Sequence, residues 1–253
     1  EDDLSQLKET IMMLQRFNGM PNLDWMSELV VKLEDKLNLR GSSQSVVGYD
    51  DNKSYTGLSW FRDLFDAIIN KAVLSIKYTT FTKVTYEWII HPYYIKEYNN
   101  RWFLLGLNED SDDIYNIPLD RIQAIEQINK EYIQPKIDFN QYFNDVIGVS
   151  VLPLEKETIL LQFSEYRFPY VITKALHSSQ KIVDADKHII EISVIPNNEL
   201  DALILSFGKD VRVLSPMSYR DKIKEIVKES YENYSTVQID CTDQVHLCKK
   251  STL

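Results

Sequence analysis

The first forty residues place apolar side chains at three- and four-residue steps, which is the spacing of one face of an α-helix. One such stripe runs over residues 4–17 and a second over 26–37, and Gly41 follows as a helix stop. Two short amphipathic helices leave an apolar face uncovered when they pair only with each other. The pattern therefore predicts a helical linker or dimerisation hairpin over residues 1–41 that packs on another module, on a second copy of the chain or on the domain that follows.

The apolar period falls from about four to two after a third helical stripe at residues 58–68. At Asn99-Asn100 the pattern predicts a tight hairpin turn, because asparagine tolerates the positive φ of such turns. Six short strands in a row are typical of a small barrel or sandwich of five or six strands. The predicted strands lie around Leu74–Tyr78, Val84–Ile90, Tyr93–Glu97, Trp102–Leu107, Ile114–Ile117 and Arg121–Ile128.

A second domain of mixed pattern follows the barrel. Its alternation of strands and helices predicts an α+β layer, with helices on one face of a small antiparallel sheet. The expected strands are 158–163, 181–183, 189–194 and 211–213, and the expected helices are 171–176, 200–207 and one opened by Ser215-Pro216. The domain boundaries that follow are 1–41 (helical linker), 42–134 (barrel with its leading helix), 135–153 (link), 154–235 (α+β domain) and 236–253 (tail).

Length and charge narrow the class of protein. A chain of 253 residues with 44% hydrophobic content is long enough for two modest cores. The formal net charge of −10 argues against this segment alone holding a DNA duplex, since nonspecific affinity comes from neutralising phosphates. No apolar run of membrane length and no signal peptide occur, so we expect a soluble, cytoplasmic protein. Because residue 1 is Glu just before a helix, we also expect sequence upstream.

Local signatures of enzymes are missing from the sequence. It contains no G-x-S-x-G, no phosphate-cradling G-x-x-x-x-G-K, no H-E-x-x-H and no G-x-G-x-x-G. We therefore predict no catalytic residues, no cofactor and no enzyme activity. A set of groups assembled only in space would escape this search, so a nucleotide-processing hydrolase stays as an alternative.

Two segments offer metal-binding side chains in unsuitable patterns. Asn108, Asp110 and Asp112 echo the first half of a calcium loop, but Asp113 replaces the required glycine and Leu119 the bidentate glutamate. A solvated acidic turn is the better interpretation. The tail offers a further set that matches no common structural zinc spacing, namely Cys241, His246 and Cys248. We predict no metal site.

Three short motifs occur in the order and spacing of a known family. They resemble the WYL domain, a small Sm/SH3-like β-barrel, and Gly208 with residues 213–216 resembles the ferredoxin-like C-terminal extension that accompanies it. Residues 29–39 are similar to the linker helices that join a winged helix to this barrel. The motifs are His91-Pro92-Tyr93-Tyr94, Arg101-Trp102-Phe103-Leu104 and Leu119-Asp120-Arg121-Ile122.

The resemblance implies the ligand-sensing and oligomerisation region of a bacterial transcription regulator. Such a protein is expected to be a homodimer, to bind DNA through a winged helix-turn-helix upstream of this chain, and to bind an anionic small molecule, nucleotide or oligonucleotide in the barrel. The alternative is a ligand-free dimerisation scaffold. Two positions depart from the family pattern: Phe103 stands where tyrosine is usual, and Pro118 where many members carry arginine.

The candidate ligand-binding residues surround these motifs. Arg121 offers a planar fork suited to phosphate or carboxylate, and the alternative is a surface pair with Asp120. Trp102 is either a core residue or a stacking platform. Neighbours on a strand point to opposite faces, so Tyr93 is preferred to Tyr94. The predicted set is Arg121, Arg101, Lys96, His91, Tyr93, Tyr78 and Trp102.

Overall fold

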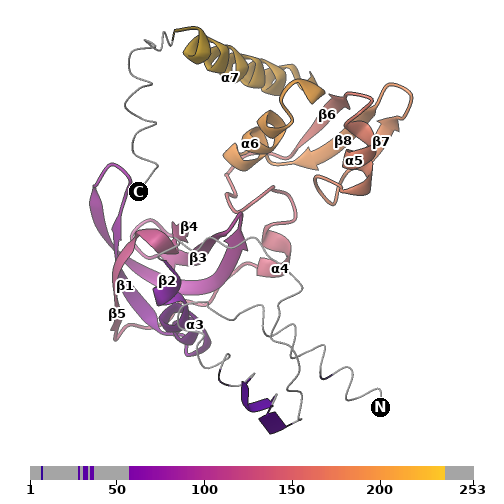
Figure 1. The fold of residues 1–253 in the computed structure, drawn as a ribbon. Helices are drawn as coiled ribbons and strands as arrows, with labels where there is room; N and C mark the ends of the chain where they lie inside the picture. The colour runs from indigo at the N-terminus through magenta and orange to yellow at the C-terminus, as the bar shows by residue number, and fades with distance from the viewer. Residues whose placement is uncertain (1–6, 8–27, 29–30, 34, 37–56, 237–253) are drawn as a thin grey trace, which may run out of the picture. The chain divides into compact units, whose positions relative to one another are not determined.

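The computed structural model describes residues 57–236 together with positions 7, 28, 31–33, 35 and 36. These isolated positions are helical, and the rest of the predicted hairpin, the polar linker before residue 57 and the tail lie outside the described residues. The chain divides into two compact units between Phe139 and Asn140 (Figure 1). Each unit is described by itself.

The first unit is a helix followed by five antiparallel strands. Its strand order is β4-β3-β2-β1-β5, which gives five strands where the sequence pattern predicted five or six. The elements are η2 (Gly57–Trp60), α3 (Phe61–Ile69), β1 (Val73–Thr79), β2 (Thr85–Tyr98), β3 (Arg101–Asn108), β4 (Asp113–Pro118), η3 (Leu119–Arg121) and β5 (Ile122–Ile128).

The hydrogen bonding of this sheet corrects the expectation of a closed barrel. β4 and β5 are its two edge strands, and no pairing joins them within the described residues. The break lies at η3, where Leu119–Arg121 form a helical turn instead of continuing as strand. The sequence pattern predicted Arg121 as the first residue of a strand. In the structure Arg121 is the last residue of this turn, and β5 begins at Ile122. The unit is a curled five-stranded sheet.

A second correction concerns β2. The sequence pattern predicted two strands on either side of Pro92, whereas the structure has one strand of 14 residues with an irregular register between Pro92 and Tyr94. Proline lacks the N–H that a ladder requires and is tolerated in a strand where a bulge interrupts the pairing. The bulge therefore explains both the continuous strand and the misleading proline.

The turn between β2 and β3 has the conformation expected for it. Asn99 and Asn100 have φ values of 51° and 59°, as a type I′ hairpin turn requires. Arg101 then pairs with Tyr98, and the register continues up to Leu104 opposite Ile95.

One face of the sheet is covered by α3 and forms the core of the first unit (Figure 1). Leu64 of α3 and Ile76 of β1 are fully buried there. The indole of Trp60 donates to the carbonyl of Ile122 at 3.1 Å, which fixes the start of the helix against β5. Strand alternation places Trp102 on this face, where its ring meets Phe61 edge-on at 5.0 Å.

The second unit is an α+β domain with the element order β-α-β-β-α-β, the order of a ferredoxin-like unit. Its four-stranded sheet is antiparallel with the order β7-β8-β6-β9. After a short helix α4 (Phe139–Tyr142), the elements are β6 (Glu157–Phe163), α5 (Phe168–Thr173), β7 (Lys181–Asp184), β8 (Ile189–Val194), α6 (Asn198–Ser206), η4 (Gly208–Asp210), β9 (Val211–Ser215) and α7 (Met217–Thr236).

The predicted helix over residues 171–176 is displaced by about one turn. It runs from Phe168 to Thr173 instead, because Pro169 fits the first turn of a helix, where an N–H is not needed. Leu176 lies beyond its end, and its N–H donates to the side chain of Gln180 at 2.9 Å.

The predicted link before the second sheet is partly structured. The side chain of Asn197, 1% exposed, caps α6 by accepting from the N–H of Leu200 at 2.9 Å. The same side chain donates to the carbonyls of Ile147 and Ser150, each at 2.8 Å. One buried amide therefore joins the helix start to the link.

Of the helices in the described part of the chain, none combines the length and apolar composition that a membrane crossing requires.

Candidate ligand-binding site

The guanidinium of Arg121 lies at the end of η3 beside the tip of the β1–β2 hairpin. Its Nη1 donates to the hydroxyl of Tyr78 at 3.1 Å, and its Cζ lies 3.3 Å from the centroid of the Phe81 ring. Its Nε is buried without a hydrogen-bond partner. Within the described residues no carboxylate lies at ion-pair distance from it, since the neighbouring Asp120 pairs with Arg101. This cation therefore keeps hydrogen-bonding capacity for an anion.

Aromatic rings continue from this guanidinium along β1 and β2. Tyr78 stacks on Trp88 with centroids 4.7 Å apart, and Trp88 stacks on Tyr86 at 5.5 Å. The rings meet because Tyr78 and Tyr86 are register partners and Trp88 is two residues further along the same strand face. Tyr86 is 45% exposed and Phe81 72% exposed. Exposed rings beside a cation suit a ligand that has both a flat base and a phosphate.

The other predicted cations are Arg101 and Lys96. Arg101 contacts Asp120, with Nη2 and Oδ2 3.4 Å apart. Lys96 of β2 is the register partner of Phe103 in β3. Because side chains alternate along a strand, Lys96 and Arg101 lie on one face of the sheet and Trp102 lies on the other. Burial lowers the pKa of Lys96. The structure thus brings Tyr78 to Arg121 and pairs Arg101 with the carboxylate of the adjacent Asp120, and the roles of Arg101 and Lys96 in ligand binding stay predictions.

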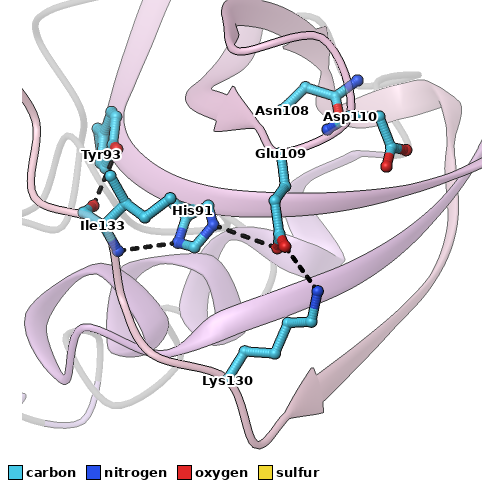
Figure 2. Close-up of polar contacts among 7 residues, drawn as sticks. All are labelled: His91, Tyr93, Asn108, Glu109, Asp110, Lys130 and Ile133. Atoms are coloured by element: carbon cyan, nitrogen blue, oxygen red, sulfur yellow. Dashed lines mark hydrogen bonds and ion pairs between the residues drawn. The ribbon is translucent and has the colours of Figure 1, made fainter.

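His91 and Tyr93 belong to a second polar cluster, which holds the chain after β5 against the bulge of β2. The Nδ1 of His91 accepts from the N–H of Ile133 at 3.1 Å, and the Tyr93 hydroxyl donates to the Ile133 carbonyl at 2.9 Å (Figure 2). The Tyr132 hydroxyl donates to the carbonyl of Pro92 at 2.6 Å. We call residues 130–133 the strap, and these bonds fasten it to β2.

An ion pair closes the other end of the strap. The Nζ of Lys130 lies 2.7 Å from Oε1 of Glu109, and Oε2 of Glu109 lies 3.6 Å from Nε2 of His91 (Figure 2). Because the Lys130 ammonium donates to Glu109, it lowers the pKa of that carboxyl. An open cleft of about 410 Å³ lies here, and its lining carries both acids and a cation. This mixture of charges gives the cleft no preference for an anion.

The imidazole of His91 is buried, 1% exposed, and its Nε2 has no hydrogen-bond partner. Since Nδ1 accepts a backbone N–H, the neutral ring carries its proton on Nε2. Burial lowers the pKa of His91, and the nearby Glu109 carboxylate opposes that shift without overcoming it. The ring that fastens the strap is therefore the neutral form.

Two family models match the chain. A WYL domain covers residues 59–127 and a WCX domain covers residues 155–231, together more than half of the chain. The chain belongs to the WYL-domain family. The WYL match contains Arg121 with its aromatic neighbours and ends before the strap, and the WCX match contains the second sheet. This is the domain pair of WYL-domain transcription regulators.

Solved structures with similar chains include the proteasome accessory factor B/C (PafBC) of Arthrobacter aurescens, 16% identical, with a TM-score of 0.32, over 88% of this chain and 35% of that one. A CRISPR Cas-related protein is 13% identical, with a TM-score of 0.44, over 71% of this chain and 52% of that one. The WYL–WCX chain thus spans about a third to a half of the length of these proteins. No curated protein matches it.

The sequence did not indicate every member of the two clusters. Phe81 lies in the β1–β2 turn and is 72% exposed. The available signal in the sequence was an aromatic residue between two threonines in a predicted turn. Glu109 and Lys130 carried no signal, because 21 residues separate them.

The acidic segment after β3 forms a turn that leads into β4. The side chain of Asn108 accepts from the N–H of Asp110 at 3.1 Å, and no cluster of three or more metal-binding acids, histidines or cysteines occurs within the described residues. The tail set of Cys241, His246 and Cys248 lies outside them.

The buried histidine predicts how the stability of the WYL unit depends on pH. The unfolded chain takes up a proton near the ordinary pKa of 6.5, whereas the folded His91 does so at lower pH. Between these values the unfolded state binds more protons, so the free energy of unfolding falls as the pH drops through 6.5 toward the lower pKa of the folded His91. Below the pKa of His91 in the folded state, protonation of this residue lowers the free energy of unfolding no further. We expect His91→Gln to flatten this dependence.

Urea unfolding followed by tryptophan fluorescence checks this expectation, because all four tryptophans precede residue 103 and report the first unit. His177→Gln is the matched control, since burial also lowers the pKa of His177 but in the WCX unit. The pKa of Glu109 lies below its ordinary value of 4.5, so the stabilisation from Glu109 is lost only as the pH falls through 4.5 toward that lower pKa. An unchanged pH slope in His91→Gln would contradict the assignment.

Proposed function

We propose that this chain is the ligand-sensing and oligomerisation region of a bacterial DNA-binding transcription regulator, and that its WYL domain binds a nucleotide or short single-stranded nucleic acid. The observation that carries the proposal is the Arg121 guanidinium, which lies on aromatic rings with a buried, unpaired Nε and no carboxylate at ion-pair distance within the described residues. A phosphate would supply the missing partner, and Phe81 and Tyr86 would supply stacking surface for a base.

The net charge of the chain fits a ligand smaller than a duplex. At −10, the chain repels an extended polyanion, whereas a local cation on an aromatic surface suits one or a few nucleotides. Contact with an operator is then the task of a winged helix upstream, in a homodimer. This matches the function that the family resemblance implies.

A ligand changes such a regulator only if it binds one conformation better than another. Arg121 lies in η3, and β5 leads directly from η3 to the strap. Binding that shifts η3 therefore acts on the strand whose far end is fastened by His91 and Tyr93. In this proposal, these two residues transmit the signal rather than contact the ligand.

Fluorescence anisotropy with a fluorescein-labelled oligothymidylate of about ten nucleotides tests the proposal. Loss of one charged hydrogen-bonding contact is worth about 1.5–3 kcal/mol, so Arg121→Ala is expected to weaken binding about 10- to 100-fold. The slope of log Kd against the logarithm of the salt concentration should also decrease by about one in this variant.

Arg62→Ala is the matched control, because this arginine has the same charge but lies on the surface of α3 in an exposed pair with Asp66. It should change the affinity less than about twofold. Equal affinities in the two variants would remove Arg121 from the site. Failure of the unaltered protein to bind either the oligonucleotide or a mononucleotide such as dTMP would favour the ligand-free scaffold.

A further inference from the structure

The WCX unit contains a cleft of its own between α5 and α6, with a volume of about 350 Å³. Its walls are Tyr170 and Lys174 on the α5 side and Leu203 and Phe207 on the α6 side, with Arg167 at the start of α5. Leu203 and Phe207 also pack on the core of the unit, so this wall is fixed in place. The cleft lies within the second unit and is independent of the function proposed for the WYL domain.

Arg167 is held in this cleft by aromatic rings more than by an acid. Its Cζ lies 5.6 Å from the centroid of Tyr170 and 5.8 Å from that of Phe207, within the range of cation–π contact. Its Nη2 is 4.0 Å from Oδ2 of Asp210, the outer limit of an ion pair. The other carboxylate oxygen of Asp210 accepts from the hydroxyl of Ser164 at 3.0 Å. The Nε of Arg167 is buried without a hydrogen-bond partner.

The lining combines positive charge with apolar surface. Arg167 and Lys174 are its charged residues, and none of the eight residues that line it is acidic. A planar guanidinium fork binds a carboxylate with two parallel hydrogen bonds. The neighbouring rings and leucines offer contact area for a flat apolar body about the size of one aromatic ring.

We propose that this cleft binds a small aromatic carboxylate, with the carboxylate on Arg167 and the ring between Tyr170 and Phe207. Lys174, which is exposed at the cleft edge, attracts the anion and adds affinity without positioning it. The WYL–WCX chain then has two separate anion receptors: one for nucleotides on the first sheet and one for a small organic acid on the second unit.

Fluorine NMR of 4-fluorobenzoate with the whole chain tests this site, with 4-fluorobenzyl alcohol as the neutral probe of the same shape. We expect the carboxylate to bind and to lose at least tenfold in affinity in Arg167→Gln, with a smaller loss in Lys174→Gln. Arg212→Gln is the matched control. Arg212 is exposed on β9, and strand alternation places it on the sheet face opposite to the buried Val213.

Each other outcome overturns the proposal. Equal binding of the acid and the alcohol would show a nonspecific apolar surface, and no binding of 4-fluorobenzoate would exclude the proposed ligand class. Lys174→Gln keeps the test valid if Arg167→Gln fails to fold, because Lys174 is exposed and its loss must still weaken the carboxylate alone. Arg121→Ala should leave 4-fluorobenzoate binding unchanged, which separates this site from the one proposed in the WYL domain.

Discussion

Asn197→Ala is expected to lower the free energy of unfolding of the WCX unit by about 2–4 kcal/mol. The cap on the N–H of Leu200 accounts for about 1 kcal/mol of this loss. The remainder comes from the carbonyls of Ile147 and Ser150, which lose their donor in a place where Asn197 is 1% exposed and water does not replace it easily.

Hydrogen exchange of the WCX amides, together with urea unfolding followed by far-UV circular dichroism, measures this effect. Asn198→Ala is the matched control: the adjacent asparagine is exposed at the first position of α6 and should change stability by less than about 0.5 kcal/mol. The tryptophan fluorescence transition, which reports the first unit, should stay in place. A loss in Asn197→Ala no greater than in the control would show that the cap and the link are not coupled.

Gly106→Ala is expected to destabilise the WYL unit by about 2–3 kcal/mol through overpacking. A Cβ atom on Gly106 would lie 2.6 Å from Cγ2 of Ile90 and 2.7 Å from the backbone carbonyl oxygen of His91. Ile90 is fully buried and the other contact is backbone, so neither neighbour can move away easily. The strand β2 must shift at its bulge, and His91 shifts with it.

Tryptophan fluorescence during urea unfolding reports this loss directly, and the pH dependence caused by His91 should weaken in the same variant. Gly208→Ala gives the contrasting control: it has φ +56° and nothing within 4 Å of an added Cβ. It should cost only the left-handed backbone strain of about 1–2 kcal/mol, in the other unit. Full stability of Gly106→Ala would mean that the two strands can separate without cost.

The sequence predicted most elements of the fold because their signals are local. The hairpin at Asn99-Asn100 needed only residues that accept positive φ. The β-α-β-β-α-β order of the second unit followed from apolar periods within short windows. The errors arose where tertiary structure decides the outcome: Pro92 is accommodated by a bulge that depends on β3, and the barrel stays open because of a helical turn at η3.

The candidate site was predicted less completely, because contacts between distant residues decide it. Arg121 and Tyr78, both predicted, form a hydrogen bond across 43 positions. Phe81, which covers the same guanidinium, carried no motif. The cations Arg101 and Lys96 looked like partners because they flank one turn. In the structure Arg101 pairs with Asp120, and strand alternation places Arg101 and Lys96 on the sheet face opposite to Trp102.

The strap keeps water away from the bulge of β2. While it is fastened, His91 is 1% exposed and Tyr93 8% exposed, and the ring of Phe139 continues this cover by stacking on Tyr94 with centroids 5.2 Å apart. The strap is held by side-chain bonds to β2 and not by a strand ladder, so it can open without unfolding the sheet. Amide protons of the strap are therefore expected to exchange with solvent before those in the centre of the sheet.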